Sequence, residues 1–203
     1  MQAPLASAPG HDVAHKIIVI GASTGGDQAV RQILQTLPGD LDASVLIALH
    51  PRSGVSGNWE NVGALPVRYA RQGDAIVPGH VYIAPPLRHL EVGADCLLQL
   101  SEPTPGLRPI PWADRLFLTA VSVFGNRVIG VVLTGNDSDG SQGMKAIHDA
   151  GGVGIVQEPS DAADPSMPLS SLRIDHPAYC LPLREISAVL GKLAGQTPDS
   201  VII

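Results

Sequence analysis

Aromatic side chains are scarce in this 203-residue chain, at 3% of the sequence, and its 13 Lys and Arg are outnumbered by 19 Asp and Glu. Proteins that bind single-stranded nucleic acids stack bases on aromatic side chains, and those that bind duplexes neutralise phosphates with clustered Lys and Arg. The basic residues here are scattered along the sequence. We therefore expect no nucleic-acid partner.

Cysteine is also scarce: Cys96 and Cys180 each stand among apolar residues, without CxxC spacing. This pattern disfavours a disulfide framework and a zinc site, and we expect two buried free thiols, no metal and no cofactor. No run of about eighteen apolar residues is present, and the N-terminus lacks the basic-then-apolar order of a signal peptide. We therefore expect a cytoplasmic protein without membrane insertion.

With 44% apolar residues, the chain can bury one substantial core, and we expect one domain. Residues 1–14 are small, contain proline and show no hydrophobic periodicity, which predicts a disordered N-terminal arm. The domain is therefore expected to cover residues 15–203.

Short apolar runs rich in Val and Ile alternate with amphipathic stretches, which predicts an α/β fold with a mostly parallel sheet. Between residues 67 and 100 the apolar runs are separated by Gly and Pro instead of helices, so we expect an antiparallel hairpin or an edge addition there. The expected strands cover 16–20, 44–49, 81–84, 127–133 and 153–156, and the expected helices cover 28–37, 112–124, 144–150 and 183–193.

Residues 21–26, with the sequence GASTGG, follow the first expected strand and precede the first expected helix. A tight turn in this position lifts the hydroxyl of Ser23 out of the sheet, as in the strand-turn-helix elbow that presents a serine nucleophile. The turn lacks the Lys of a P-loop, and Ser23 stands where a dinucleotide fingerprint needs glycine. A nucleophile, a phosphate or nucleotide site, and a simple tight turn with a capping serine all stay open at this point.

Two further strand ends bring polar side chains to the same edge of the sheet. His50 ends the second expected strand, and residues 134–144, with the sequence TGNDSDGSQGM, follow the strand at 127–133. These groups suggest a triad in which His50 takes the proton of Ser23 and an aspartate, Asp137 or Asp139, orients the imidazole. The alternatives are an ordinary surface histidine and a cation-binding loop, although a strand precedes this loop where an EF-hand has a helix.

Together these segments resemble the catalytic domain of the CheB-type chemotaxis methylesterases, the protein-glutamate methylesterases. The resemblance covers nearly the whole chain from Lys16 to about Leu193. The segments that carry it are 20–26, 50–51, 73–74, 78–85, 88–90, 132–135, 138–140 and 143–144.

The resemblance implies a doubly wound, mostly parallel sheet and hydrolysis of glutamyl methyl esters on the cytoplasmic segments of chemoreceptors, which releases methanol. Deamidation of receptor glutamines is a further activity that it implies. It assigns Ser23 as nucleophile, His50 as base and Asp139 as the orienting carboxylate. Thr24 and the backbone of Asn136 correspond to positions that line the oxyanion region.

The chain departs from the family pattern at Asn136 and Asp137, where methionine and glycine are usual. A backbone N–H at Asn136 survives this change, but the extra charge of Asp137 would oppose a developing oxyanion. The alternative is therefore a catalytically degenerate, methylesterase-like binding module. The receiver domain typical of the family is not expected either, because fourteen residues before the first strand are too few to form one.

Overall fold

The computed structural model describes residues 15–50, 57–103 and 112–195, so the arm expected at residues 1–14 lies outside the described residues. Within them, seven strands form one sheet in the order β3-β4-β2-β1-β7-β8-β9, with every neighbouring pair parallel, and β5 and β6 form a separate antiparallel hairpin. The strands are β1 (Lys16–Ala22), β2 (Ala43–Leu49), β3 (Val67–Tyr69), β4 (Val81–Ile83), β5 (His89–Val92), β6 (Leu98–Ser101), β7 (Val128–Val132), β8 (Val153–Gln157) and β9 (Tyr179–Leu181).

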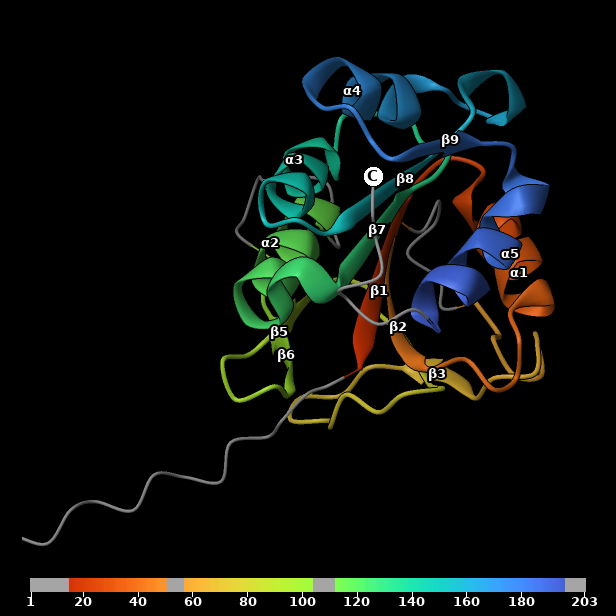
Figure 1. Ribbon diagram of the computed structural model, residues 1–203. Helices are drawn as coiled ribbons and strands as arrows, with labels where there is room; N and C mark the ends of the chain where they lie inside the picture. Colours follow the sequence, from red (N-terminus) through yellow and green to blue (C-terminus); the bar gives the residue numbers. More distant parts are fainter. Residues whose placement is uncertain (1–14, 51–56, 104–111, 196–203) are drawn as a thin grey trace, which may run out of the picture.

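Helices cover both faces of the sheet (Figure 1). α1 and α5 pack together on one face, while α2 packs against α3 on the other, with α4 beside α3. Alternate residues of β1 enter the two cores: Ile18 and Ile20 face the first, and Ile17 and Val19 face the second. Burial on both faces explains why the central strands have continuous apolar sequences. The helices are α1 (Gly26–Thr36), α2 (Ala113–Phe124), α3 (Ser141–Asp149), α4 (Ser166–Ile174) and α5 (Leu183–Ala194).

The strand order reverses between β1 and β7. From β1 the chain builds the sheet in one direction through β2 and β4, and then returns to the other side of β1 for β7, β8 and β9. Open parallel sheets bind ligands at the carboxyl ends of the strands beside such a reversal. The register pairs Ala22 with Leu49 and Gly21 with Val132, so the residues that follow β1, β2 and β7 emerge side by side.

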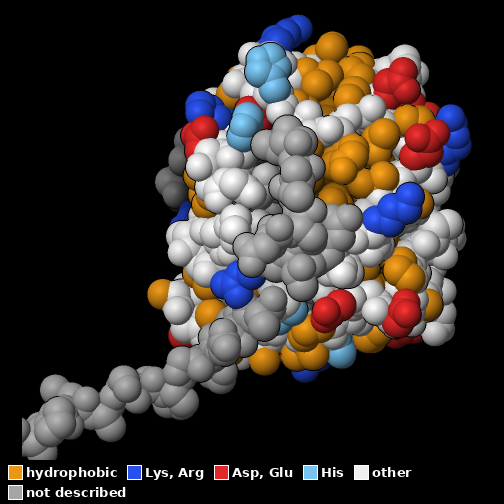
Figure 2. All heavy atoms as spheres, in the orientation of Figure 1, with side chains coloured by type: hydrophobic (Ala, Val, Ile, Leu, Met, Phe, Trp, Pro, Cys, Tyr) orange, Lys and Arg blue, Asp and Glu red, His pale blue; other side chains and the backbone are white. Residues whose placement is uncertain are grey.

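The α/β class, the parallel sheet and the short antiparallel hairpin are confirmed. β3 is the edge addition, and it pairs with β4 in parallel. α4 and β9 were not among the expected elements. Among the described residues, no helix combines the length and the apolar character needed to cross a membrane. On the face drawn in Figure 2, Lys and Arg are interspersed with Asp and Glu instead of forming a stripe.

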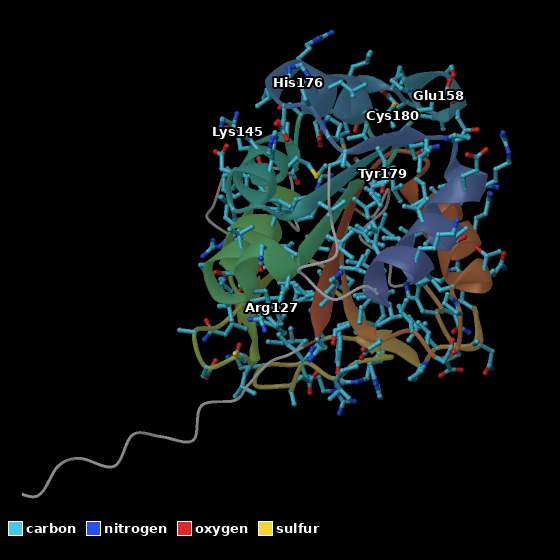
Figure 3. All side chains as sticks on the ribbon, in the orientation of Figure 1. Arg127, Lys145, Glu158, His176, Tyr179 and Cys180 are labelled. Atoms are coloured by element: carbon cyan, nitrogen blue, oxygen red, sulfur yellow. The ribbon has the colours of Figure 1, made fainter. Side chains whose placement is uncertain are left out.

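The expectation of two buried thiols is wrong. Both cysteines are free, but Cys96 is only half-buried and Cys180 is exposed. Cys180 lies on β9 next to Tyr179 (Figure 3), and among the described strands β9 pairs with β8 alone, at the end of the sheet. Unlike β1, which has a strand on each side, β9 is an edge strand and its residues are less completely covered. The apolar neighbours of Cys180 in the sequence therefore did not imply burial.

Candidate active site

Ser23 lies one residue beyond the end of β1, in a turn built by glycine. Gly25 has the left-handed backbone conformation, with φ of 80°, and α1 begins at the next residue, Gly26. The Gly26 N–H donates to Ser23 O over 2.7 Å, which closes the turn. A side chain at position 25 would be strained, and its Cβ would lie 2.7 Å from the Cβ of Ala163. The sequence of small residues therefore places Ser23 in front of the positive end of α1.

Thr134, the second residue after β7, fixes this turn from the neighbouring strand. Its carbonyl oxygen accepts the Ser23 N–H at 2.9 Å, and its hydroxyl donates to Thr24 O at 2.8 Å. Its own N–H donates to Gln157 Oε1 at 2.9 Å. Sequence reasoning gave no role to Thr134 or Gln157, although the position of Thr134 at a strand end was a usable signal. Both are positioning residues for the serine turn.

His50 follows β2, and its N–H donates to Ala22 O at 3.0 Å, which anchors it beside the end of β1. Its Nε2 lies 3.1 Å from Asp139 Oδ2 and its Nδ1 lies 3.4 Å from Asp137 Oδ2. The side chain is 11% exposed. Burial alone would lower the pKa of His50, but the hydrogen bonds and charges of Asp137 and Asp139 outweigh it and raise the pKa to about 9.

Asp139 is 4% exposed and is held by backbone groups as well as by His50. Its Oδ2 accepts the Ala113 N–H at 2.6 Å, and its Oδ1 accepts the N–H groups of Asp114 and Gly140 at 3.0 and 2.9 Å. Ala113 and Asp114 form the first turn of α2, whose preceding residue provides no side-chain cap. Asp139 therefore supplies the acceptor that the amino end of α2 needs.

Asp114 is a half-buried carboxyl that sequence reasoning missed. Its Oδ1 accepts the Gly143 N–H at 2.7 Å. Burial, aided by the nearby charge of Asp139 and opposed by backbone hydrogen bonds, raises the pKa of Asp114 to about 6. It ties α2 to α3 and forms no hydrogen bond with His50 among the described residues.

The Ser23 hydroxyl donates to Asn136 Oδ1 at 3.2 Å. No hydrogen bond joins Ser23 to His50 in the part of the chain that the structure describes, so the three predicted triad residues are brought to one edge without a complete relay. Gly135 makes this closeness possible, because a Cβ there would lie 2.8 Å from the Cβ of Ser23 and 2.0 Å from the sulfur of Met167.

Two backbone N–H groups could stabilise an oxyanion on a substrate bound at Ser23. Those of Thr24 and Asn136 donate to no acceptor among the described residues. The N–H of Gly135 is already used, because it donates to Asp164 O at 3.0 Å. Thr24 and Asn136, the two residues expected to line this region, therefore each have a backbone N–H that an oxyanion could accept from.

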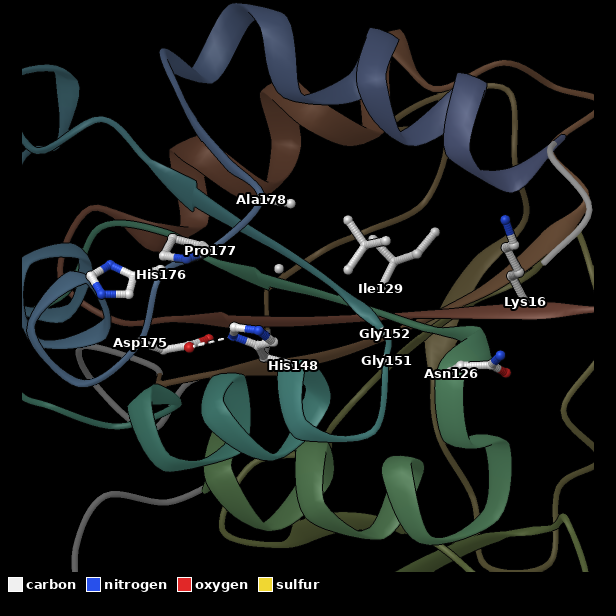
Figure 4. Close-up of a pocket in the computed structure, with 12 residues that line it drawn as sticks. Lys16, Asn126, Ile129, His148, Gly151, Gly152, Asp175, His176, Pro177 and Ala178 are labelled. Carbon is white, nitrogen blue, oxygen red and sulfur yellow. Dashed lines mark hydrogen bonds and ion pairs between the residues drawn. The ribbon is translucent and has the colours of Figure 1, made fainter. Parts of the chain in front are cut away.

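A separate cavity of about 380 Å³ lies at the opposite end of the strands (Figure 4). Lys16 and Val153, the first residues of β1 and β8, line it. On its wall, His148 Nδ1 lies 2.5 Å from Asp175 Oδ1. Because Ser23 follows the last residue of β1, this cavity belongs to a different part of the molecule.

Comparison with known proteins identifies relatives of the chain. The family model described as CheB methylesterase matches residues 18–190. A protein-glutamate methylesterase/protein-glutamine glutaminase of Myxococcus xanthus is 36% identical over 88% of this chain and 54% of its own length. A putative protein of the same description from Leptospira interrogans is 35% identical over 88% of this chain and 95% of its own length.

A crystal structure of the Thermotoga maritima CheB methylesterase catalytic domain matches 89% of this chain and 100% of that domain, with a TM-score of 0.81 and 28% identity. The chain spans about half the length of the first curated relatives that it matches, at 54% and 53%. The expected resemblance is confirmed by the family model, by the sequence relatives and by the solved structure.

Proposed function

The chain belongs to the CheB methylesterase family, and from this premise we propose that it is a serine hydrolase that converts glutamyl methyl esters of chemoreceptors to glutamate and methanol. The observation that carries the proposal is the convergence of three strand ends, which bring Ser23, His50 and Asp139 to the point where the strand order reverses. Its partners are the methylated cytoplasmic segments of chemoreceptors, and its place of action is the cytoplasm.

The reaction would use Ser23 as nucleophile. Its oxygen attacks the ester carbonyl while His50 accepts the hydroxyl proton, and the N–H groups of Thr24 and Asn136 stabilise the oxyanion. The intermediate collapses as His50 returns the proton to the leaving methoxide, which departs as methanol. Water, deprotonated by His50, then hydrolyses the acyl-enzyme to release the glutamate and restore Ser23. No metal or cofactor takes part in these steps.

Glutamine deamidation would follow the same route. The leaving group is then ammonia in place of methanol, and the same acyl-enzyme is hydrolysed. The relatives from Myxococcus and Leptospira carry both activities in their descriptions. We propose deamidation as a second activity of the same three residues.

The test is methanol release from a methyl-esterified chemoreceptor fragment. Ser23→Ala should lower the rate at least about 10³-fold, because the nucleophile is removed while the fold persists. The matched control is Ser122→Ala, which removes an exposed hydroxyl from α2 and should retain the rate within about twofold. A fluorophosphonate should label the unmodified chain and the control but not Ser23→Ala.

Retained turnover by Ser23→Ala would refute the assignment of the nucleophile. The second candidate function, a degenerate binding module, is favoured by one observation: Ser23 is hydrogen-bonded to Asn136 instead of His50. It requires that the unmodified chain binds the receptor fragment, releases no methanol and stays unlabelled at every pH.

A further inference from the structure

His50 has a carboxylate against each of its ring nitrogens. Asp139 Oδ2 lies 3.1 Å from Nε2, and Asp137 Oδ2 lies 3.4 Å from Nδ1. A working triad needs one nitrogen to donate to the orienting aspartate and the other to accept the proton of the nucleophile. Because Asp139 is hydrogen-bonded to Nε2, the nitrogen left to accept the Ser23 proton is Nδ1. Asp137 forms an ion pair with that nitrogen.

The Ser23 hydroxyl is held by the same stretch of chain. It donates to Asn136 Oδ1 at 3.2 Å, and Asn136 is the residue before Asp137. Asp137 is itself fixed, since its Oδ1 accepts the Asp139 N–H at 2.9 Å. Two consecutive side chains therefore engage the nucleophile and the base separately.

We propose that Asn136 and Asp137 form a latch, a pair of positioning residues that holds Ser23 and His50 apart until both contacts are broken. The proposal rests on the proposed function, because it takes Ser23 as the nucleophile and His50 as the base. Methionine and glycine, the residues that the family resemblance leads one to expect at these positions, have no side-chain oxygen that could hold either group.

The charges around His50 favour the closed latch. Burial opposes the charged ring, but Asp137 and Asp139 raise the pKa of His50 to about 9, so the imidazole carries a proton near neutral pH and cannot accept one. Burial likewise acts to raise the pKa of Asp137, yet its contact with His50 holds it below the ordinary value. Beyond these two carboxylates lie Asp114 on α2 and His89 on β5, and the charge of Asp139 acts on both.

The experiment compares Asp137→Gly and Asp137→Asn with the unmodified chain. The first variant frees Nδ1, and the second keeps an oxygen for the Asp139 N–H but removes the charge beside His50. The matched control is Asp27→Asn, which removes one exposed charge near Ser23 on α1, where Asp27 pairs with Arg31. The measured quantity is the rate of Ser23 labelling by a fluorophosphonate between pH 5.5 and 10.

The unmodified chain should reach half its maximal labelling rate near pH 9. Both Asp137 variants should reach it at least about one pH unit lower, which raises the rate at pH 7 about tenfold or more, since the neutral fraction of a base changes tenfold per pH unit. Asp27→Asn should follow the unmodified chain. A purely structural role for Asp137 would lower the rate without moving the midpoint.

An unchanged midpoint in both Asp137 variants would overturn the latch. If the proposed function itself is wrong, the labelling result differs from this one, because Ser23 then stays unlabelled at every pH in every variant. In that case the latch is still tested by NMR, which follows the His50 imidazole signals over the same pH range. Equal His50 midpoints in the unmodified chain and in Asp137→Asn would contradict the proposal even without any activity.

Discussion

At the scale of single residues, Asp139 serves two parts of the molecule. It faces His50, and it accepts three backbone N–H groups, two of them from the first turn of α2. Charge-assisted hydrogen bonds to a helix amino end are stronger than neutral ones, and a donor left without its acceptor in a buried site is costly. The carboxylate therefore contributes to folding as well as to the candidate chemistry.

Asp139→Ala should lower the free energy of unfolding by about 3 kcal/mol, because two buried backbone donors and one half-buried donor lose their acceptor. Urea unfolding at pH 7 measures this loss. Asp27→Ala is the control, since it removes an exposed carboxylate that pairs with Arg31 and should cost under about 1 kcal/mol. Equal losses for the two variants would show that Asp139 has no such structural task.

The sequence predicted that Ser23 and His50 would meet at one edge, but spacing alone left Asp137 and Asp139 equivalent. Both in fact contact His50. What separates them is the first turn of α2, which is 25 residues away in the chain and binds only Asp139. A contact of that kind has no local sequence signal, and only the family resemblance selected Asp139.

At the scale of elements, the loop after β7 and the start of α4 press against the serine turn. The Gly135 N–H donates to Asp164 O, and the Met167 N–H donates back to Gly135 O at 2.9 Å. No side chain fits between them, because a Cβ added to Gly135 would lie 2.0 Å from the Met167 sulfur. α4 thus forms part of the support of Ser23.

Gly135→Ala should therefore displace α4 or Ser23. We expect a loss of about 1 to 3 kcal/mol in the free energy of unfolding and slower fluorophosphonate labelling of Ser23. Gly195→Ala is the matched control, because Gly195 has an ordinary φ of −79° and the atom nearest to the added carbon would lie 3.8 Å away. Thermal unfolding and labelling rates of both variants provide the measurement. If Gly135→Ala matches Gly195→Ala in thermal stability and in labelling rate, then α4 does not support Ser23.

Elements with strong periodicity were predictable, and those without it were not. β1, β2, β7 and β8 are buried on both faces and have continuous apolar sequences, so they could be located to within two residues. α4 escaped prediction because Pro168 lies in its first turn and its apolar pattern is weak. β9 is three residues long, with two of them exposed, and its place in the sheet depends on pairing with β8.

At the scale of the whole molecule, the proton on His50 links stability to pH. Its pKa is about 9 in the folded protein and ordinarily 6.5. A pKa raised by folding adds stability that is fully present below 6.5 and is lost as the pH rises towards 9. The buried His89, whose pKa is lowered mainly by burial, acts below 6.5 and in the opposite direction. Between pH 6.5 and 9 the raised pKa of His50 therefore makes the folded protein less stable as the pH rises.

We predict that the free energy of unfolding falls by up to about 3 kcal/mol between pH 6.5 and 9, as expected for a pKa raised by about 2.5 units. Urea unfolding at several pH values measures the slope. His50→Gln should remove most of it, because no imidazole then titrates between the two carboxylates. Parallel curves for the two proteins would mean that another group carries the pH dependence.

Asp139 contacts His50 and also accepts hydrogen bonds from the amino end of α2. These two roles affect what its conservation in related sequences means. A descendant that abandoned catalysis would still be under selection to keep this aspartate, since the amino end of α2 depends on it. The presence of Asp139 in a distant homologue is therefore weak evidence that the homologue is an enzyme. The Ser23 side chain makes one hydrogen bond, to Asn136 Oδ1, so the loss or survival of this serine is the better record of whether the chemistry was inherited.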